Sequence, residues 1–194
     1  MARRTLFLLV MLLVACSRST PVAYYLLEGS VTPVKADSLP AKSLRVARVV
    51  VPEYLDRNGI VYRVAGKARL MVAQFDVWAE PLGQGVRRVV REELAPRLFA
   101  NGITVTAADD EGGDMVLFLD VQRLDGTLAG KTHIETRWTL KNKHDEILCQ
   151  GVYADEETAH GNACDDFVRA QSALVCRMAE HLAGIVSSIP VKEK

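Results

Sequence analysis

The stretch WAEPLGQGVRRVVREELAPRL (residues 78–98) contains the change of hydrophobic period that decides the fold. The residues before it, 68–78, are expected to form a strand, whereas within it apolar side chains recur every fourth residue, as on one face of a helix. These apolar residues are Val86, Val90, Leu94 and Leu98, with Val89 beside them. Pro81 suits a first helical turn, and Pro96 is expected to weaken the last one. The stretch therefore predicts a strand that passes into an amphipathic helix.

Arginine side chains occupy the other side of this predicted helix. Arg87, Arg88 and Arg91 lie there together with Glu92. They could form a binding surface or an ordinary solvated face. The solvated face is the favoured interpretation, because surface helices commonly carry charged residues opposite their apolar stripe.

Strand patterns flank the helix on both sides, and a second helix closes the chain. Asn58-Gly59 between two apolar runs predicts a hairpin turn, and Asp165 and Asp166 favour the start of a long helix that ends at Ile189. The expected strands cover residues 22–28, 44–52, 68–78, 115–121, 134–140 and 147–154. This order predicts a single α+β domain in which a mostly antiparallel sheet is packed by two main helices.

The N-terminus has the order of a bacterial export signal that ends in a lipid-attachment cysteine. Arg3 and Arg4 precede an apolar run at residues 6–13, which is shorter than the ~20 residues of a membrane-spanning helix. Small and apolar residues then lead into Cys16. This order resembles the lipobox of bacterial lipoproteins, in which the cysteine is diacylated and cleavage occurs before it. We therefore expect residues 1–15 to be a signal peptide and Cys16 the lipid attachment site; an ordinary signal with an incidental cysteine is the alternative.

The residues after Cys16 bear on which membrane holds the anchor. Ser17 stands where an aspartate commonly retains bacterial lipoproteins in the inner membrane, so the serine favours the outer membrane. Residues 16–23 are expected to form the lipidated cysteine and a tether of roughly 25 Å at full extension. Residues 24–190 then form the domain. The sequence thus predicts a domain anchored by lipid at the periplasmic face of the outer membrane.

Composition narrows the classes of partner. The 194 residues include 24 basic and 24 acidic side chains, and loss of Arg3 and Arg4 with the signal leaves a slight acidic excess. Domains that bind nucleic acid are usually basic, so no nucleic-acid partner is expected. Since no second long apolar segment follows the signal, membrane attachment is expected through the lipid anchor.

Three cysteines remain after Cys16, and an exported protein can join two of them. Cys164 and Cys176 are separated by about 18 Å along one predicted helix, which is beyond the reach of a disulfide. Cys149 is then one partner of any bond, and a disulfide between Cys149 and Cys164 is the favoured hypothesis. In the competing interpretation all three thiols are reduced and buried.

No metal site and no cofactor are expected. His160 with Cys149 and Cys164 would supply three ligands, but no closely spaced CxxC pair accompanies them. The acidic run DDEGGD (residues 109–114) lacks the spaced ligands and terminal glutamate of a calcium loop. A turn between strands is the favoured interpretation of that run.

Catalytic motifs are missing from the sequence. It contains no G-x-S-x-G, no H-E-x-x-H and no glycine-rich phosphate loop. His133 falls on a polar strand face and His144 in a turn, and neither belongs to a recognisable catalytic group. We therefore expect a protein that is not an enzyme.

Four motifs occur in a particular order along the chain. They are the lipobox at Cys16, YYLL at residues 24–27, VVVPEYLDRNGIVYR at residues 49–63 and WAEPL at residues 78–82. The striped helix follows the last motif directly. Together these features resemble the ABC-type transport auxiliary lipoprotein family over essentially the whole chain after the signal, and the motifs at residues 49–63 and 78–82 are the most specific part.

The resemblance implies an accessory role in transport. It implies an outer-membrane lipoprotein that works beside an MCE-domain periplasmic protein of the PqiB type, in a system that moves lipid between the inner and outer membranes. It also implies a homo-oligomeric ring that receives the end of the MCE conduit and supports envelope integrity. An assembly or pilotin-like lipoprotein of another envelope machine is the alternative, and a lipid-anchored hydrolase is the least supported class.

Within this resemblance, the WAEPL motif is expected to fix the corner between strand and helix. Its residues of interest are Trp78, Glu80, Pro81 and Leu82. Trp78 and Leu82 are expected in the core, because a large aromatic side chain at such a corner is usually packed. Direct contact of the corner with a partner is the second interpretation.

Overall fold

The computed structural model describes residues 20–30, 42–106, 113–161 and 163–189. The strands in these ranges are β1 Ala23–Tyr25, β2 Lys42–Val46, β3 Gly59–Arg63, β4 Leu70–Trp78, β5 Ile103–Val105, β6 Met115–Gly126, β7 Lys131–Asn142 and β8 Ile147–Thr158. The helices are α2 Leu82–Phe99 and α3 Cys164–Ser188. The predicted signal peptide and Cys16 lie outside the described residues.

The strands form two sheets, each with parallel and antiparallel pairs. The larger sheet has the order β5-β2-β6-β7-β8 and the smaller one β1-β4-β3. The long ladders between β6, β7 and β8 are antiparallel, whereas the short strands β1, β2 and β5 pair in parallel with their neighbours. The predicted α+β class with two main helices is confirmed. The sequence pattern did not reveal the division into two sheets or the short strand β5.

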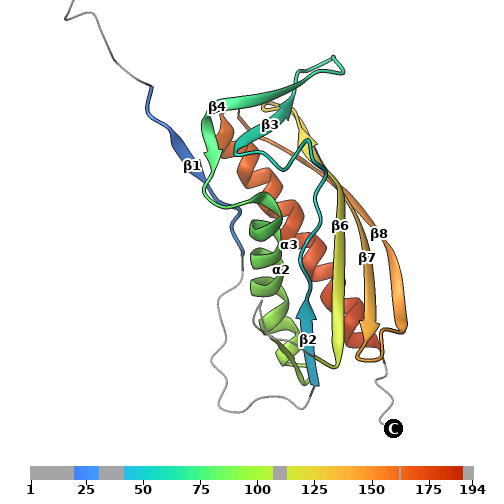
Figure 1. Cartoon of the computed structure of the whole chain (residues 1–194). Helices are drawn as coiled ribbons and strands as arrows, with labels where there is room; N and C mark the ends of the chain where they lie inside the picture. Colours follow the sequence, from blue (N-terminus) through green and yellow to red (C-terminus); the bar gives the residue numbers. More distant parts are fainter. Residues whose placement is uncertain (1–19, 31–41, 107–112, 162, 190–194) are drawn as a thin grey trace, which may run out of the picture.

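Both helices cover one face of the larger sheet (Figure 1). Every second residue of β7 from Thr132 to Leu140 is buried, which is the alternation expected of a sheet covered on one side only. The predicted apolar stripe of α2 is fully buried and comprises Val86, Val89, Val90, Leu94 and Leu98. The helix continues beyond Pro96 for three further residues, so the stripe remains intact to its end.

The hairpin of β3 and β4 differs from the one that the sequence indicated. Asn58-Gly59 is not its turn, because Gly59 begins β3 and the chain reverses between Val64 and Arg69, where a backbone hydrogen bond of 3.0 Å closes the loop. Position 59 needs glycine for another reason. A Cβ there would stand 2.3 Å from the carbonyl oxygen of Ala73 on β4, so the Asn-Gly pair marks a close contact between strands.

The expected strand at residues 44–52 is also shorter than predicted. β2 ends at Val46, and the chain then runs beside β6 with a single parallel bridge between Val50 and Asp120. Backbone hydrogen bonds from Val50 to Leu119 and from Val121 to Val50, of 3.0 and 2.9 Å, hold it there. The β-branched run is therefore a connection that leads from the larger sheet to the smaller one.

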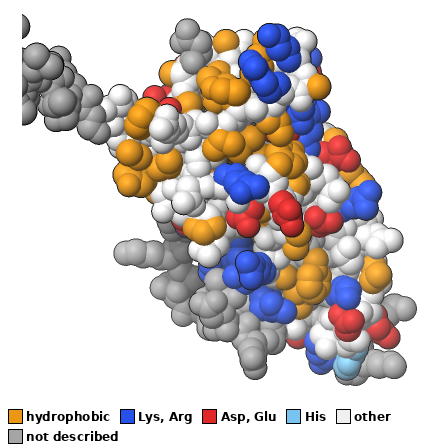
Figure 2. Space-filling view, turned by 45° about the horizontal axis from the view of Figure 1, so that its top comes forward, with side chains coloured by type: hydrophobic (Ala, Val, Ile, Leu, Met, Phe, Trp, Pro, Cys, Tyr) orange, Lys and Arg blue, Asp and Glu red, His pale blue; other side chains and the backbone are white. Residues whose placement is uncertain are grey.

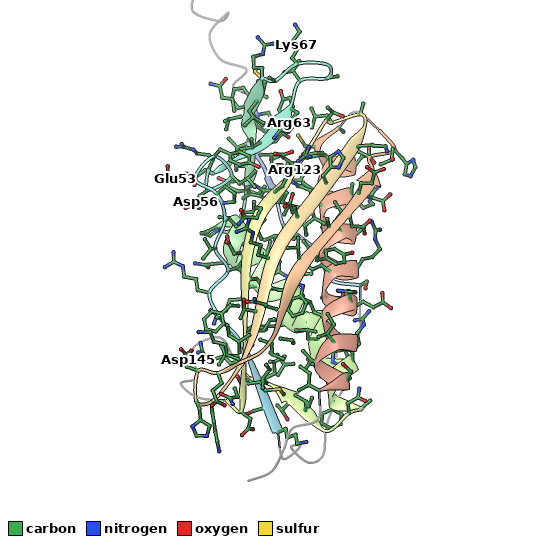
Figure 3. All side chains as sticks on the ribbon, turned by 90° about the vertical axis from the view of Figure 1, so that its right-hand side faces the viewer. Glu53, Asp56, Arg63, Lys67, Arg123 and Asp145 are labelled. Carbon is green, nitrogen blue, oxygen red and sulfur yellow. The ribbon has the colours of Figure 1, made fainter. Side chains whose placement is uncertain are left out.

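A buried carboxylate joins β3 of the smaller sheet to β6 of the larger one. The side chain of Asp125 on β6 is fully buried, and Arg63 of β3 donates hydrogen bonds of 2.7 Å to each of its oxygens. Arg123 Nε donates at 2.9 Å and the Tyr54 hydroxyl at 2.8 Å. Figure 3 shows Arg63 and Arg123 near one another where the β3–β4 hairpin meets the larger sheet. The four side chains hold the β3–β4 hairpin against the larger sheet.

The hydrogen bonds decide the charge of this carboxyl group. Burial acts to raise the pKa of Asp125, but the bonds from Arg63, Arg123 and Tyr54 outweigh it and lower the pKa below its usual value. Burial and the bond to Asp125 raise the pKa of Tyr54 to about 12. Asp125 is therefore ionised and Tyr54 protonated at neutral pH, which is the arrangement that the contacts require.

Removal of this carboxylate is expected to loosen the joint between the sheets. Asp125→Ala should lower the free energy of unfolding by about 3 kcal/mol, because it leaves two arginines and a buried hydroxyl without their acceptor. Urea unfolding followed by circular dichroism measures the loss. Asp145→Asn is the matched control, since Asp145 is 79% exposed and pairs only with Lys141; it should change stability by less than about 0.5 kcal/mol.

The lowered pKa of Asp125 also predicts a pH dependence. A carboxyl whose pKa is lower in the folded state stabilises the fold above its unfolded value of about 3.9, and that contribution disappears as the pH falls through the folded pKa. The free energy of unfolding of the wild type should therefore fall more steeply below about pH 4 than that of Asp125→Asn. Identical acid dependence of the two proteins would contradict the assignment of Asp125 as an ionised joint.

Candidate functional site

The WAEPL corner stands where β4 passes into α2. Trp78 ends β4, Pro81 caps the helix and Leu82 is its first residue. Trp78 and Leu82 are buried in the core, with 8% and 3% of their surfaces exposed. Glu80 accepts hydrogen bonds of 3.0 and 2.8 Å from Arg88 at the surface of the corner. The structure thus brings the four residues together, while their contact with a partner stays a prediction.

The arginine side of α2 was predicted to be a solvated face. In the structure its arginine side chains are half-buried. Three of its arginines donate hydrogen bonds to backbone carbonyls: Arg87 to Val46 at 2.9 Å, Arg88 to Leu27 at 2.7 Å and Arg91 to Thr106 at 3.2 Å. Each satisfies a carbonyl group of a different segment beside the helix. These side chains therefore stabilise the packing of the fold around the corner.

Strand β1 fixes the N-terminal end of the domain to the same corner. It pairs in parallel with the end of β4, so that Ala23 lies opposite Asp76 and Tyr25 opposite Trp78. The Tyr25 hydroxyl donates to Asp76 at 2.9 Å, and partial burial together with this bond raises the pKa of Tyr25 to about 12. The chain before β1 consequently leaves the domain at a defined place. Neither of the two helices described is long and apolar enough to cross a membrane.

Exposed apolar side chains lie on β1 and the residues on either side of it, and on β4 of the β3–β4 hairpin. We call this surface the tether patch, and it consists of Val22, Tyr24, Leu26, Met71, Val72 and Phe75. Lys67 and Arg69 are exposed in the hairpin loop next to it. Figure 2 shows hydrophobic side chains beside lysine and arginine side chains on the face that contains this end.

A second exposed apolar surface lies on β8, the last strand of the larger sheet. We call it the edge patch, and it consists of Ile147, Leu148 and Val152. Residues 147–154 carry no charged side chain, whereas Asp155 and Glu157 further along the strand pair with Arg177 of α3 at 2.7 and 2.6 Å. β8 has no neighbouring strand on its outer side within the described chain, so its uncharged half leaves an edge open to pairing.

The predicted disulfide between Cys149 and Cys164 is absent. Cys149, Cys164 and Cys176 are all free thiols. Cys149 stands near the start of β8 and Cys164 follows its end, so a strand of roughly 30 Å separates them. Burial raises the pKa of Cys164 and of Cys176 to about 11, which disfavours the reactive thiolate.

The residues weighed as metal ligands are not gathered into a site. Within the described ranges, no three histidine, cysteine or carboxylate side chains stand close enough to hold a metal ion. Cys149 lies at the other end of β8 from His160 and Cys164. Of the acidic run, residues 109–112 lie outside the described chain, and Asp114 accepts hydrogen bonds of 2.9 and 3.0 Å from the backbone and hydroxyl of Ser43.

The cations and exposed apolar residues of the hairpin were not predicted from the sequence. The signal that could have found them is a charge asymmetry: residues 61–75 contain Arg63, Lys67 and Arg69 and no acidic residue. This asymmetry does not by itself indicate a surface, because residues 68–78 were predicted to form a regular strand with one side in the core. Only the fold reveals that both faces of β4 near the hairpin loop are exposed.

Solved structures share this fold. The crystal structure of an uncharacterized protein superposes with a TM-score of 0.71 at 24% identity, over 86% of this chain and 99% of the other. The crystal structure of a protein from Xanthomonas campestris superposes with a TM-score of 0.69 at 19% identity, over 85% of this chain and 94% of the other. At these identities the likeness concerns the fold alone.

Sequence relatives carry the assignment further. PqiC of Escherichia coli K12 and of Shigella flexneri, an intermembrane transport lipoprotein, is 25% identical over 147 residues, which cover 76% of this chain and 76% of PqiC. The sequence profile of the ABC-type transport auxiliary lipoprotein component family matches residues 24–183. That description names an accessory component of transport. Because the match includes the corner, both sheets and nearly all of both helices, the chain belongs to the ABC-type transport auxiliary lipoprotein component family.

Proposed function

We propose that this protein is an outer-membrane-anchored accessory lipoprotein of an MCE-type intermembrane lipid transport system. Cys16 carries the lipid anchor, and the domain docks the periplasmic MCE conduit at the outer membrane and supports envelope integrity. The family match over residues 24–183 carries this proposal.

The attachment of β1 supports a position directly against the membrane. The described chain begins at Thr20, and the four residue-to-residue steps from Cys16 to Thr20 extend over at most about 14 Å. β1 then enters the smaller sheet beside β4 and is held there by its parallel pairing. A lipid on Cys16 would therefore keep the tether end of the domain close to the bilayer, where a conduit from the other membrane has to arrive.

The name of PqiC supports the choice of transport system. PqiC is an intermembrane transport lipoprotein, and we extend that role to this chain, with an MCE-domain protein of the PqiB type as its partner. The absence of recognisable catalytic motifs in the sequence agrees with an accessory role. A pilotin-like lipoprotein of another envelope machine remains the competing function, and the partner that is recovered separates the two.

The edge patch supports the ring that we propose as the assembled form. An open strand edge pairs readily with another chain, and the uncharged half of β8 presents Ile147, Leu148 and Val152 beside it. The two ends of the larger sheet, β5 and β8, are different surfaces. A contact between different surfaces of two copies repeats head to tail and can close into a ring.

Recovery of the partner from the cell envelope tests the docking role. The lipidated protein should recover an MCE-domain protein from detergent extracts of cross-linked envelopes. Cys16→Ser should reduce that recovery by on the order of 100-fold, because the anchor confines the protein to the membrane surface at which the conduit arrives and so raises its effective concentration there. Quantitative mass spectrometry of the recovered proteins gives the measurement.

The same experiment separates the two candidate functions. Recovery of components of a secretion or barrel-assembly machine, without any MCE-domain protein, would support the pilotin-like role. Intact mass of the purified protein shows independently whether Cys16 carries acyl chains. If the anchor is present and no MCE-domain protein is recovered from either variant, the proposed docking role is wrong.

Substitution in the edge patch tests the ring. Val152→Glu should shift the protein from a multimer toward a monomer, with association weakened by on the order of 30-fold, because it buries a charge in the contact between copies. Native mass spectrometry and light scattering measure the mass. Val72→Glu provides the control, since Val72 is exposed to a similar extent, 53% against 59%, but lies on the tether patch. A monomeric wild type, or equal effects of the two substitutions, would contradict this contact.

A further inference from the structure

The β3–β4 hairpin projects from the body of the domain at the end where β1 lies (Figure 1). Every residue of its loop, residues 65–69, is exposed, and Figure 3 shows Lys67 at the outermost point of the loop, away from the helices. Met71 and Val72 are exposed on adjacent positions of β4, with 40% and 53% of their surfaces accessible. Since successive residues of a strand point to opposite faces, the hairpin near its loop is uncovered on both sides.

The charges of the hairpin are all of one sign. Residues 61–75 contain three cations and no carboxylate. Arg63 is already bound to Asp125, whereas Lys67 and Arg69 in the loop make no ion pair with any residue of the described chain. Two free cations thus stand near the exposed apolar side chains Met71 and Val72, and Phe75 is exposed further along the strand.

We propose that the tip of this hairpin is a second membrane contact of the protein. Lys67 and Arg69 bind lipid phosphate groups, and Met71, Val72 and Phe75 enter the boundary between headgroups and acyl chains. The lipid surface is the one that holds the acyl chains of Cys16, so the inference rests on the anchor in the proposed function. It adds a contact made by the folded domain itself.

The short chain between Cys16 and β1 indicates that the partner of the hairpin is the bilayer that holds the lipid. At most about 14 Å of chain joins Cys16 to Thr20, and Thr20 lies three residues before β1. Because β1 runs parallel to residues 76–78 of β4, the chain before β1 leads in the direction of the start of β4, where the hairpin loop lies. A bilayer that holds the lipid therefore lies at the end of the molecule from which the hairpin projects. A cationic and apolar protrusion suits an anionic bilayer, which attracts lysine and arginine and accepts apolar side chains at its interface.

The Asp125 joint gives this second contact a mechanical consequence. Arg63 on β3 binds Asp125 of the larger sheet, so the hairpin does not move independently of the body. Two contacts on one rigid body, at Cys16 and at the hairpin, restrict how the domain tilts on the membrane. The contact thus sets the orientation in which the domain meets an arriving conduit.

Tryptophan substitution in the lipidated full-length protein tests this contact. The protein is reconstituted into vesicles of phosphatidylethanolamine and phosphatidylglycerol, with or without brominated acyl chains that quench tryptophan. Trp78 and Trp138, 8% and 7% exposed, give the same background in every variant. Val72→Trp should be quenched by the brominated lipid, and Val152→Trp on β8, at similar native exposure, should not. Quenching of Tyr24→Trp on β1 measures how close β1 lies to the membrane.

The cations are tested in the same vesicles. In the Val72→Trp protein, Lys67→Ala and Arg69→Ala should each shift the equilibrium away from the membrane by about fivefold. Removal of two exposed cations elsewhere, by Arg137→Ala and Lys143→Ala, should leave the quenching unchanged. Far-UV circular dichroism establishes that each variant is folded. Equal effects of the two pairs would overturn the assignment of Lys67 and Arg69.

The outcomes separate this inference from the proposed function. If intact mass shows an acylated Cys16 and Val72→Trp is quenched no more than Val152→Trp, the hairpin contact is wrong and the anchor stands. If the mass shows no acyl chains, the anchor in the proposed function fails and the inference fails with it. Quenching of Val72→Trp in the acylated protein, with none at Val152→Trp, supports the contact.

Discussion

The ion pair between Asp125 and Arg63 is the interaction on which the arrangement of the domain depends. The two residues come from different sheets, and the carboxylate is fully buried with four hydrogen bonds to it. A buried charge is tolerated only when its partners remain in place, so the contact fixes the hairpin sheet at one angle to the larger sheet. The position of the exposed hairpin relative to the larger sheet depends on this contact, whereas pairing with β4 holds β1 at the corner.

Polar side chains link segments elsewhere in the domain in the same way. Arg88 ties α2 to Glu80 and to the chain after β1, and Arg177 ties α3 to β8 through Asp155 and Glu157. These contacts surround a core built from the stripes of two helices, the inner face of the larger sheet and buried residues of β3 and β4. These arginines therefore act chiefly within the fold, whereas Lys67 and Arg69 of the hairpin loop are exposed and make no ion pair with any residue of the described chain.

The sequence and the structure agree on the candidate site only in part. The WAEPL corner was recognisable, because Pro81 and the change of period act locally. The disulfide between Cys149 and Cys164 was not excluded by spacing, since only the direction of β8 places the two cysteines at its opposite ends. The turn of the hairpin was predicted at the wrong place for a related reason. Asn58-Gly59 is a strong local turn signal, but Gly59 is required by the approach of Ala73 from another strand.

The sequence by itself determined the two helices with their apolar stripes, the long strands of the larger sheet, the α+β class and the family. These properties arise from the periodicity of neighbouring residues and from motifs that are contiguous in the chain. Only the tertiary structure decided the division into two sheets, the partners of the buried charges and the exposure of Met71, Val72 and Lys67. Such features depend on pairing between distant strands, and a strand pattern is the same whether its faces are covered or left open to a membrane.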